Sequence, residues 1–454
     1  MNKKIPLTQI DASEKISSLI DSENGTLNRT IYSDEEIYKL EMERIFARTW
    51  NFMCHESQIP NVGDYVINYI GEDQVIVVRD KEENINVLLN TCTHRGNALC
   101  RTEQGNAKSF ICSYHGWNFD LQGKVIGIPG LKDFYRDDFD KEAWGLKHAA
   151  KVDSFEGFVF ANLDPEAPSL YDYLGDVGRT GLSMITAAGD VEVVPGIQKN
   201  VIDCNWKIAV DNLFDWYHVR YSHHSAFKTG FLDLETILQP LSQMVMLGEY
   251  GHGISGPMVN DETQELLDAL TEEQKEEFKK ADSPIRLRDE KAKAKLGPFG
   301  TRSFGHPNIF PNVWVSSAAT QICLRLPRGP HETELWWYTF VPKDMDEENR
   351  KKTIYFATHL FGPAGLLEQD DGENWSQATR TSKGIASSAV PHNMKMSLGK
   401  DKVRVDEATG QRCIETTINE HGQRWTYNYW AAYMQADSWE TLHEVKPQLP
   451  EGEV

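Results

Sequence analysis

Two cysteine–histidine pairs most strongly constrain what this chain can fold into. Cys92 and His94 lie in the segment "NTCTHRGNALC", and Cys112 and His115 follow in "FICSYHGW". Thiolate and imidazole groups are metal ligands, so the two segments are expected to meet around one metal centre. Both pairs fall at the ends of predicted strands or in the loops just after them, where metal sites on β scaffolds are easily assembled.

The spacing of these four residues is C-x-H-x17-C-x2-H. Tetrahedral zinc is the alternative to consider, since two thiolates and two imidazoles satisfy it. Zinc sites usually separate their first two ligands more widely than C-x-H does. One cysteine and one histidine from each of two loops is the ligand set of a Rieske [2Fe–2S] cluster, in which the cysteines hold one iron and the histidines the other. The spacing therefore favours the cluster over zinc.

A second group of possible ligands lies in "CNWKIAVDNLFDWYHVRYSHHSAF". Asp211, Asp215 and His218 are spaced i, i+4 and i+7, which would put them on one face of a helix. His223 follows five residues after His218, a rotation of about 140° on a regular helix. Both histidines can bind one metal only if the helix ends or distorts around Val219–Ser222, and we expect such a break.

The third ligand of this second site is expected in "FGPAGLLEQDDGENW", whose apolar flanks indicate burial. The carboxylates there are Glu368, Asp370, Asp371 and Glu373. Two histidines and one carboxylate form the facial triad of mononuclear ferrous iron, with coordination positions left open for dioxygen. His224 is the rival to His223 as the second histidine ligand.

The pattern of short strands and helices predicts an α+β fold with two domains. Alternating or apolar runs at 64–70, 73–80, 85–92, 109–114 and 155–163, separated by turn residues, predict a small antiparallel β domain over residues 48–168. The remainder, residues 1–47 and 169–454, mixes helical stretches with long strand candidates at 312–326 and 334–342. It is expected to be a larger α+β domain with a central antiparallel sheet. A helix is predicted after Tyr32, with Ser33 and Glu36 as its capping box.

Charge and cysteine usage narrow the classes of function. The net charge is −21, which argues against nucleic acid and anionic membranes as partners. Seven cysteines do not form a disulfide framework, and five of them are expected to be buried structural thiols. The N-terminal segment lacks the apolar core of a signal peptide, so a cytoplasmic location is expected.

Five segments, in this order along the chain, resemble the catalytic α subunit of Rieske non-haem iron aromatic-ring-hydroxylating dioxygenases. This group includes the naphthalene, biphenyl, phenylpropionate and benzoate dioxygenases. The segments are "CTHRGNALCRTEQGNAKSFICSYHGW", "CNWKIAVDN", "DWYHVRYSH", "GHPNIFPN" and "FGPAGLLEQDDGENW". Together they cover nearly the whole chain.

The resemblance implies roles for individual residues. The cluster ligands would be Cys92, His94, Cys112 and His115, and the iron ligands His218, His223 and Asp371. Asp215 would link a cluster histidine of one subunit to His218 of its neighbour, orienting both rings and offering an electron path. The implied catalytic residues are Asp215, Asp211 and Asn212, and Asp211 stands where the benzoate type usually has glutamate. The implied pocket residues are Asn212, Leu213, His306 and Phe361.

The resemblance also implies an activity and partners. The chain would add both atoms of dioxygen to an aromatic ring, giving a cis-dihydrodiol, with electrons from NAD(P)H delivered by a flavin reductase and a ferredoxin. Three α subunits, alone or with three small β subunits, would form the oligomer. The alternatives are a Rieske monooxygenase, such as a salicylate-type hydroxylase or a demethylase, and a pure electron carrier without mononuclear iron.

Overall fold

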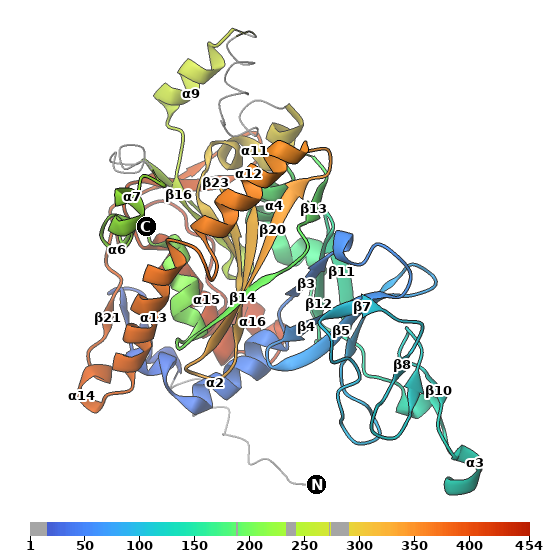
Figure 1. The fold of residues 1–454 in the computed structure, drawn as a ribbon. Helices are drawn as coiled ribbons and strands as arrows, with labels where there is room; N and C mark the ends of the chain where they lie inside the picture. Colours follow the sequence, from blue (N-terminus) through green and yellow to red (C-terminus); the bar gives the residue numbers. More distant parts are fainter. Residues whose placement is uncertain (1–15, 188, 233–241, 272, 274–289) are drawn as a thin grey trace. The chain divides into compact units, whose positions relative to one another are not determined.

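The computed structural model describes residues 16–187, 189–232, 242–271, 273 and 290–454 (Figure 1). The chain forms two compact units, one made of Phe46–Leu170 and the other of Met1–Ile45 together with Tyr171–Val454. Both contain helices and antiparallel sheets, which confirms the α+β prediction. Within the described residues, no helix combines the length and the apolar character needed to cross a bilayer.

The smaller unit is built from three antiparallel sheets, in the orders β6-β5-β4-β7, β10-β9-β8 and β11-β12-β3. Its helix is α3 (Leu131–Phe134), and its strands are β3 (Asn51–His55), β4 (Asp64–Ile70), β5 (Asp73–Arg79), β6 (Ile85–Leu89), β7 (Gln104–Asn106), β8 (Phe110–Ile111), β9 (Asn118–Phe119), β10 (Val125–Gly127), β11 (Lys151–Phe155) and β12 (Phe158–Asn162). The runs at 64–70 and 73–80 therefore form a strand pair, as their alternation predicted.

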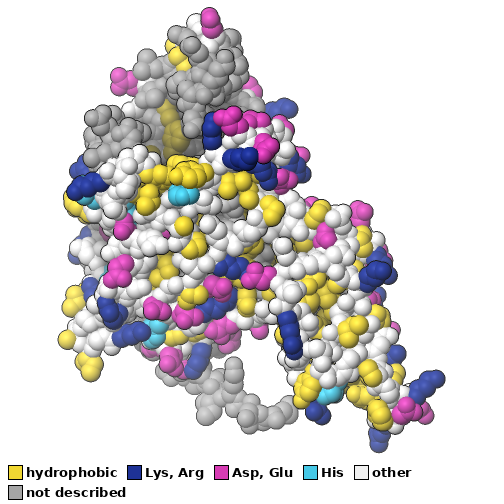
Figure 2. Space-filling model, in the orientation of Figure 1, with side chains coloured by type: hydrophobic (Ala, Val, Ile, Leu, Met, Phe, Trp, Pro, Cys, Tyr) yellow, Lys and Arg dark blue, Asp and Glu magenta, His cyan; other side chains and the backbone are white. Residues whose placement is uncertain are grey.

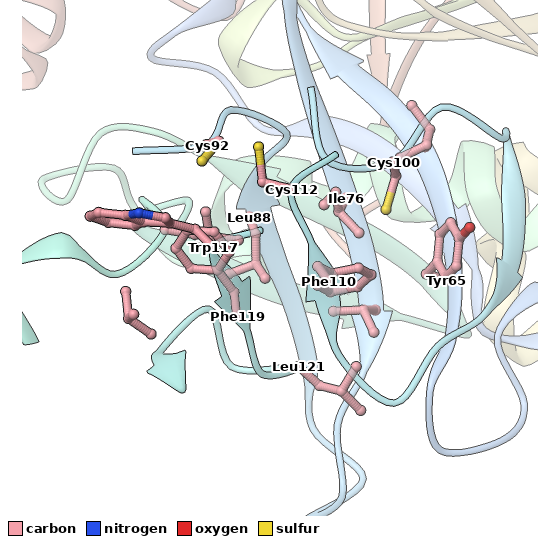
Figure 3. Packing of buried hydrophobic residues seen from close by; sticks show 14 residues of the cluster. Tyr65, Ile76, Leu88, Cys92, Cys100, Phe110, Cys112, Trp117, Phe119 and Leu121 are labelled. Carbon is pink, nitrogen blue, oxygen red and sulfur yellow. The ribbon is translucent and has the colours of Figure 1, made fainter. Parts of the chain in front are cut away.

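The strand β5 is buried on both of its faces. Val75 and Val77 belong to one apolar cluster, whereas Ile76 and Val78 belong to another, as the two-residue period of a strand requires. The second cluster also contains Cys92 and Cys112. In Figure 3 their sulfur atoms lie near each other at one side of this cluster. The apolar core of the smaller unit therefore holds both cysteine loops in position.

The larger unit contains a sheet of ten antiparallel strands in the order β13-β20-β19-β18-β17-β16-β15-β23-β22, with β14 also paired to β20. These strands are β13 (Val191–Val193), β14 (Gln198–Ile202), β15 (Gln243–Leu247), β16 (Gly253–Pro257), β17 (His306–Ile309), β18 (Val313–Ser316), β19 (Gln321–Pro327), β20 (Thr333–Pro342), β22 (Val403–Val405) and β23 (Arg412–Thr416). A three-stranded sheet of β1 (Ile20–Asp21), β2 (Thr26–Leu27) and β21 (His392–Asn393) accompanies it.

Helices lie against this sheet, with α5 in contact with β19, α12 with β20, and α15 with β15 and β16 (Figure 1). The helices are α2 (Glu35–Glu41), α4 (Leu170–Thr186), α5 (Trp206–Asp211), α6 (Val219–Ser222), α7 (His224–Lys228), α9 (Asp261–Asp268), α11 (Glu290–Arg302), α12 (Glu347–Leu360), α13 (Glu368–Ser382), α14 (Ile385–Ser388), α15 (His421–Gln435) and α16 (Trp439–Val445). Figure 2 shows acidic and basic side chains gathered together over α12, where Lys351 pairs with Glu347 and Lys352 with Glu348.

Two local predictions in the larger unit need correction. The run at 312–326 is not one strand but the hairpin of β18 and β19, because the chain reverses at 317–320, where Thr320 has a φ of 48°. The helix predicted after Tyr32 begins at Glu35, and its cap is Asp34 in place of Ser33. The Asp34 carboxylate accepts hydrogen bonds from the backbone N–H groups of Glu36 and Ile37.

A buried ion pair joins three helices of the larger unit. Glu41 at the end of α2 accepts a hydrogen bond from Lys207 Nζ of α5 at 2.6 Å. The same carboxylate accepts hydrogen bonds from the indole N–H groups of Trp206 and Trp430, the latter on α15. Glu41 is fully buried and Lys207 is 3% exposed. Each charge therefore depends on the other for compensation, because water does not reach them.

We expect Glu41→Gln to lower the thermal unfolding midpoint of the larger unit by roughly 10 °C. Removing one partner of a buried pair costs about 3–5 kcal/mol, and in a unit of this size 1 kcal/mol corresponds to about 2–4 °C. The matched control is Glu36→Gln on the same helix, which breaks only the exposed pair with Lys39. Equal midpoints for the two variants in a calorimetric scan would show that the buried pair does not stabilise the fold.

Candidate functional site

The two cysteine loops of the smaller unit have the same backbone hydrogen bonds. In the first, the N–H of Gly96 donates to the carbonyl of Cys92, and the N–H of Cys92 donates to the carbonyl of Asn97. In the second, Gly116, Cys112 and Trp117 repeat this pattern. Both glycines have a φ of 73°, a conformation that residues with a Cβ rarely adopt. The paired motifs of the sequence therefore fold into two loops of matching shape.

Each cysteine sulfur is surrounded by backbone N–H groups. Burial raises the pKa of Cys112, but hydrogen bonds from the N–H groups of Tyr114 and His115 outweigh burial and bring the pKa below its usual value. Burial is the main effect that raises the pKa of Cys92, and its hydrogen bond with the Cys112 side chain raises the pKa further. Convergent N–H donors are the environment that stabilises thiolate sulfur bound to iron.

The two histidines of these loops also lie together. The ring centroids of His94 and His115 are 4.4 Å apart, and His94 stacks on Trp117 with an interplanar angle of 2°. Nδ1 of both rings is buried and has no hydrogen-bond partner within the described part of the chain. Two thiols and two unpartnered imidazoles in adjacent loops fit the ligand set of a Rieske cluster.

Three side chains of the larger unit converge in a second site. His218 Nε2 lies 3.1 Å from His223 Nε2 and 3.2 Å from Asp371 Oδ1. His223 Nε2 lies 3.4 Å from the same oxygen. Two ligand atoms about 2.1 Å from one metal are about 3.0 Å apart at right angles and about 3.4 Å apart at tetrahedral angles. The three atoms therefore have the separations that a single metal ion requires.

The burial of this group supports the same interpretation. His223 and Asp371 are 2% and 5% exposed, and Asp371 Oδ1 and both Nδ1 atoms have no hydrogen-bond partner among the described residues. Burial lowers the pKa of His218, but the nearby carboxylates of Asp215 and Asp371 outweigh it and raise the pKa to about 10. The donor set fits ferrous iron.

The backbone around His218 differs from the predicted single helix. α5 ends at Asp211, a 3₁₀ turn covers Asn212–Phe214, and Asp215 is extended, with φ −85° and ψ 97°. The segment Val219–Ser222, where we expected the distortion, is itself the regular helix α6. The breaks lie on both sides of it, because His223 has φ −95° and ψ 25°. These two breaks turn both rings towards α13.

The other acidic and histidine candidates do not contribute an atom to the triangle of His218, His223 and Asp371. His224 is exposed on α7, and Glu373 is exposed on α13. Asp370 accepts a hydrogen bond from Ser225 Oγ and lies 3.6 Å from His223 Nδ1. Asp211 is partly buried and accepts a hydrogen bond from Tyr427 Oη, and removal of its carboxyl from water raises its pKa to about 8.

Asp215 lies beside His218 on the side away from the triangle. Its Oδ2 is 3.6 Å from His218 Nδ1, and its Oδ1 accepts hydrogen bonds from the N–H groups of Tyr217 and His218. Hydrogen bonding to His218 is the main effect that holds the pKa of Asp215 low against burial. Asp215 therefore carries a negative charge that orients the ring of His218.

A cavity of about 190 Å³ opens beside this triangle. The sequence-predicted pocket residues Asn212, Leu213, His306 and Phe361 all line it. Most of its remaining wall is apolar or aromatic, and Phe361 contacts Trp314 edge to face at a centroid distance of 4.7 Å. Burial lowers the pKa of His306 to about 3, so its ring is neutral.

Several lining residues were not found from the sequence, and two of them are ionisable, Arg325 and Glu368. Glu368 was considered only as an iron ligand. Arg325 had one usable signal, since a cation within the apolar run "QICLRLP" is unusual for a buried strand. The aromatic residues Trp314 and Trp375 had no such signal in the sequence, because a tryptophan in an apolar run ordinarily belongs to the hydrophobic core.

Comparison with known proteins gives the following matches. The family model "Ring hydroxylating alpha subunit (catalytic domain)" matches residues 176–436, and the "Rieske [2Fe-2S] domain" model matches residues 49–150. The chain is 37% identical to biphenyl dioxygenase subunit alpha of Metapseudomonas furukawaii, covering 94% of this chain and 95% of that protein. It is 34% identical to the large oxygenase component of the naphthalene 1,2-dioxygenase system of Pseudomonas aeruginosa, covering 95% and 96%.

Solved structures are similar over nearly the same extent. A naphthalene 1,2-dioxygenase with indole bound in its active site has a TM-score of 0.82 at 30% identity, covering 94% of this chain and 96% of that one. A quaternary ammonium Rieske monooxygenase has a TM-score of 0.64 at 18% identity, which shows a shared fold alone.

We expect His218→Ala to remove the mononuclear iron and to leave the cluster intact. Iron per chain should fall from about three to about two, the two irons of a Rieske cluster, as measured by mass spectrometry of the purified protein. The electron paramagnetic resonance signal of the reduced cluster should stay unchanged. The matched control is His224→Ala, which removes the exposed histidine six residues later and should keep all the iron. Loss of iron from the control alone would contradict this ligand set.

Proposed function

The chain belongs to the ring-hydroxylating α-subunit family of Rieske non-haem iron oxygenases, and from this premise we propose that it dihydroxylates an aromatic ring held in the cavity beside His218, His223 and Asp371. It is an oxidoreductase with a [2Fe–2S] cluster and mononuclear iron as its cofactors. Both atoms of dioxygen enter the ring, and the product is a cis-dihydrodiol. The observation that carries this proposal is that three side chains are spaced to bind one metal ion and also line a largely aromatic and apolar cavity.

The residues of the larger unit have separate tasks in this reaction. His218, His223 and Asp371 would hold the iron, which would supply the chemistry of dioxygen activation. Phe361 and Trp314 pack against the faces and edges of the substrate ring, since aromatic pairs favour offset and edge-to-face contacts. The neutral ring of His306 adds a polar edge to this wall without a charge.

Cys92, His94, Cys112 and His115 hold the cluster in this proposal, and electrons reach it from NAD(P)H through a flavin reductase and a ferredoxin. Asp215 connects His218 with His115 of the partner subunit, so that activity needs more than one α subunit, and the family resemblance favours a ring of three. Small β subunits complete the assembly, as in the α₃β₃ form. The support for these partners is family membership and the position of Asp215 beside His218 Nδ1.

We expect turnover under ¹⁸O₂ to give a product that carries two labelled oxygen atoms. The assay combines the purified holoenzyme with NADH, a surrogate ferredoxin and its reductase, and offers a panel of neutral and acidic aromatic compounds. Mass spectrometry of the product counts the labels. A product with a single label would identify a monooxygenase and contradict the dioxygenase proposal.

We expect Asp215→Asn to keep both metals and to slow electron transfer by about 10–100-fold, the usual effect of losing a carboxylate that orients a metal-bound histidine. Stopped-flow spectroscopy of the reduced cluster, mixed with substrate and dioxygen, measures its reoxidation. The control is Glu373→Gln, which removes an exposed acid on α13 whose carboxylate accepts a hydrogen bond from Gln377 Nε2. Reoxidation of Asp215→Asn at the control's rate would disprove the linking role.

A further inference from the structure

One buried cation lies in the wall of the cavity. Arg325 occupies β19, where its neighbour two residues earlier, Cys323, pairs with Trp314 on one side and Trp337 on the other. Because side chains alternate along a strand, Arg325 points to the same face of the sheet as these residues. Trp314 and Arg325 both line the cavity, and among the described residues Arg325 is its one lysine or arginine.

This cation lacks a compensating partner in the described part of the chain. Arg325 is 1% exposed, and neither its Nε nor its Nη1 has a hydrogen-bond acceptor there. Arg325 forms no ion pair with an acidic side chain of the described residues, whereas Arg302 and Arg328 do. Its Cζ lies 4.8 Å from the ring centroid of Trp314. A cation–π contact recovers only a small part of the hydration that a buried guanidinium loses.

Glu368 is the acid whose charge interacts with Arg325 within the same cavity. Its carboxyl is 2% exposed, and neither oxygen has a hydrogen-bond partner among the described residues. Burial raises the pKa of Glu368 to about 8, although Arg325 acts to lower it. Burial therefore favours the neutral form of the Glu368 carboxyl, and no ion pair among the described residues compensates the charge of Arg325.

We propose that Arg325 binds a carboxylate carried by the aromatic substrate, so that this chain oxidises aromatic acids in preference to neutral hydrocarbons. This inference rests on the proposed function and names the substrate class of that same site. The guanidinium matches a carboxylate in charge and planarity. The ring of the acid lies against Trp314 and Phe361, between Arg325 and the triangle of His218, His223 and Asp371. The substrate itself then supplies the anion that the cavity wall lacks.

The test compares matched acids and esters on the holoenzyme. The probes are benzoate, 2-naphthoate and biphenyl-4-carboxylate, each with its methyl ester, and biphenyl as the unsubstituted ring. Isothermal titration calorimetry gives Kd for each compound, and an oxygen electrode gives substrate-dependent oxygen uptake with NADH, ferredoxin and reductase. We expect the wild type to bind at least one acid about 100-fold or more tightly than its ester, because an unpaired buried arginine rejects the neutral analogue.

Variants at the two ionisable positions identify the cause. Arg325→Met should remove the preference for the acid and improve binding of biphenyl, whereas Arg325→Lys should retain part of the preference. Glu368→Gln keeps the shape of the side chain and abolishes any negative charge, so it should preserve the preference for acids or increase it. Thermal unfolding midpoints, measured for every variant, separate a loss of recognition from a loss of fold.

Three outcomes would overturn the inference or the proposed function separately. Equal affinity of the wild type for acids and esters would disprove carboxylate recognition, and oxygen uptake with biphenyl would then leave the proposed function standing. Lower unfolding midpoints for Arg325→Met and Glu368→Gln, with an unchanged acid-to-ester ratio, would show that Arg325 serves only to compensate Glu368. Tight binding of an acid without any oxygen uptake across the panel would contradict the proposed function and support recognition by Arg325.

Discussion

The convergence of two imidazoles and one carboxylate within 3.4 Å of one another is the constraint on which the larger unit depends. Two imidazole nitrogens and one carboxylate oxygen at such distances can all be satisfied by a single cation placed among them. Their residues are far apart in the sequence, so the sheet and its covering helices must bring α13 to the segment between α5 and α7. The non-helical backbone at Asp215 and His223 then orients the imidazole rings of His218 and His223 towards α13.

The smaller unit also brings together metal-binding side chains, but it does so with two loops that lie on an apolar core. Its two loops share backbone hydrogen bonds and a glycine with positive φ, and the core beneath them is apolar on both faces of β5. All seven cysteines of the chain, each in the described part, are buried and unpaired. Burial raises the pKa of Cys54, Cys100, Cys204, Cys323 and Cys413, which agrees with the inert structural role expected for them. Cys112, whose pKa is lowered, differs from these five because N–H groups surround its sulfur.

The sequence predicted the parts of the molecule that local patterns encode. Alternation identified β4, β5 and β6, and the spacing of cysteine and histidine identified the two cluster loops. At the second site the sequence patterns left several candidates, and the family resemblance selected His223 and Asp371 among them. The sequence did not predict where the helix around His218 breaks, because that depends on the packing of α13 against α5. Arg325 was also missed, since a strand pattern indicates which residues share a face but not whether that face borders a cavity. Whether a buried charge is compensated depends on the folded surroundings, and the side chains of Arg325 and Glu368 line one cavity without a hydrogen bond between them.

The central claim is that one iron is held by His218, His223 and Asp371. Anomalous diffraction from a crystal of the holoenzyme, recorded on both sides of the iron absorption edge, tests it most directly. The account predicts a single-iron peak about 2.0–2.3 Å from Nε2 of both histidines and from a carboxylate oxygen of Asp371, separate from the cluster's density at Cys92 and Cys112. An iron peak bound by His224, or cluster density alone in a crystal with full enzymatic activity, would contradict the account.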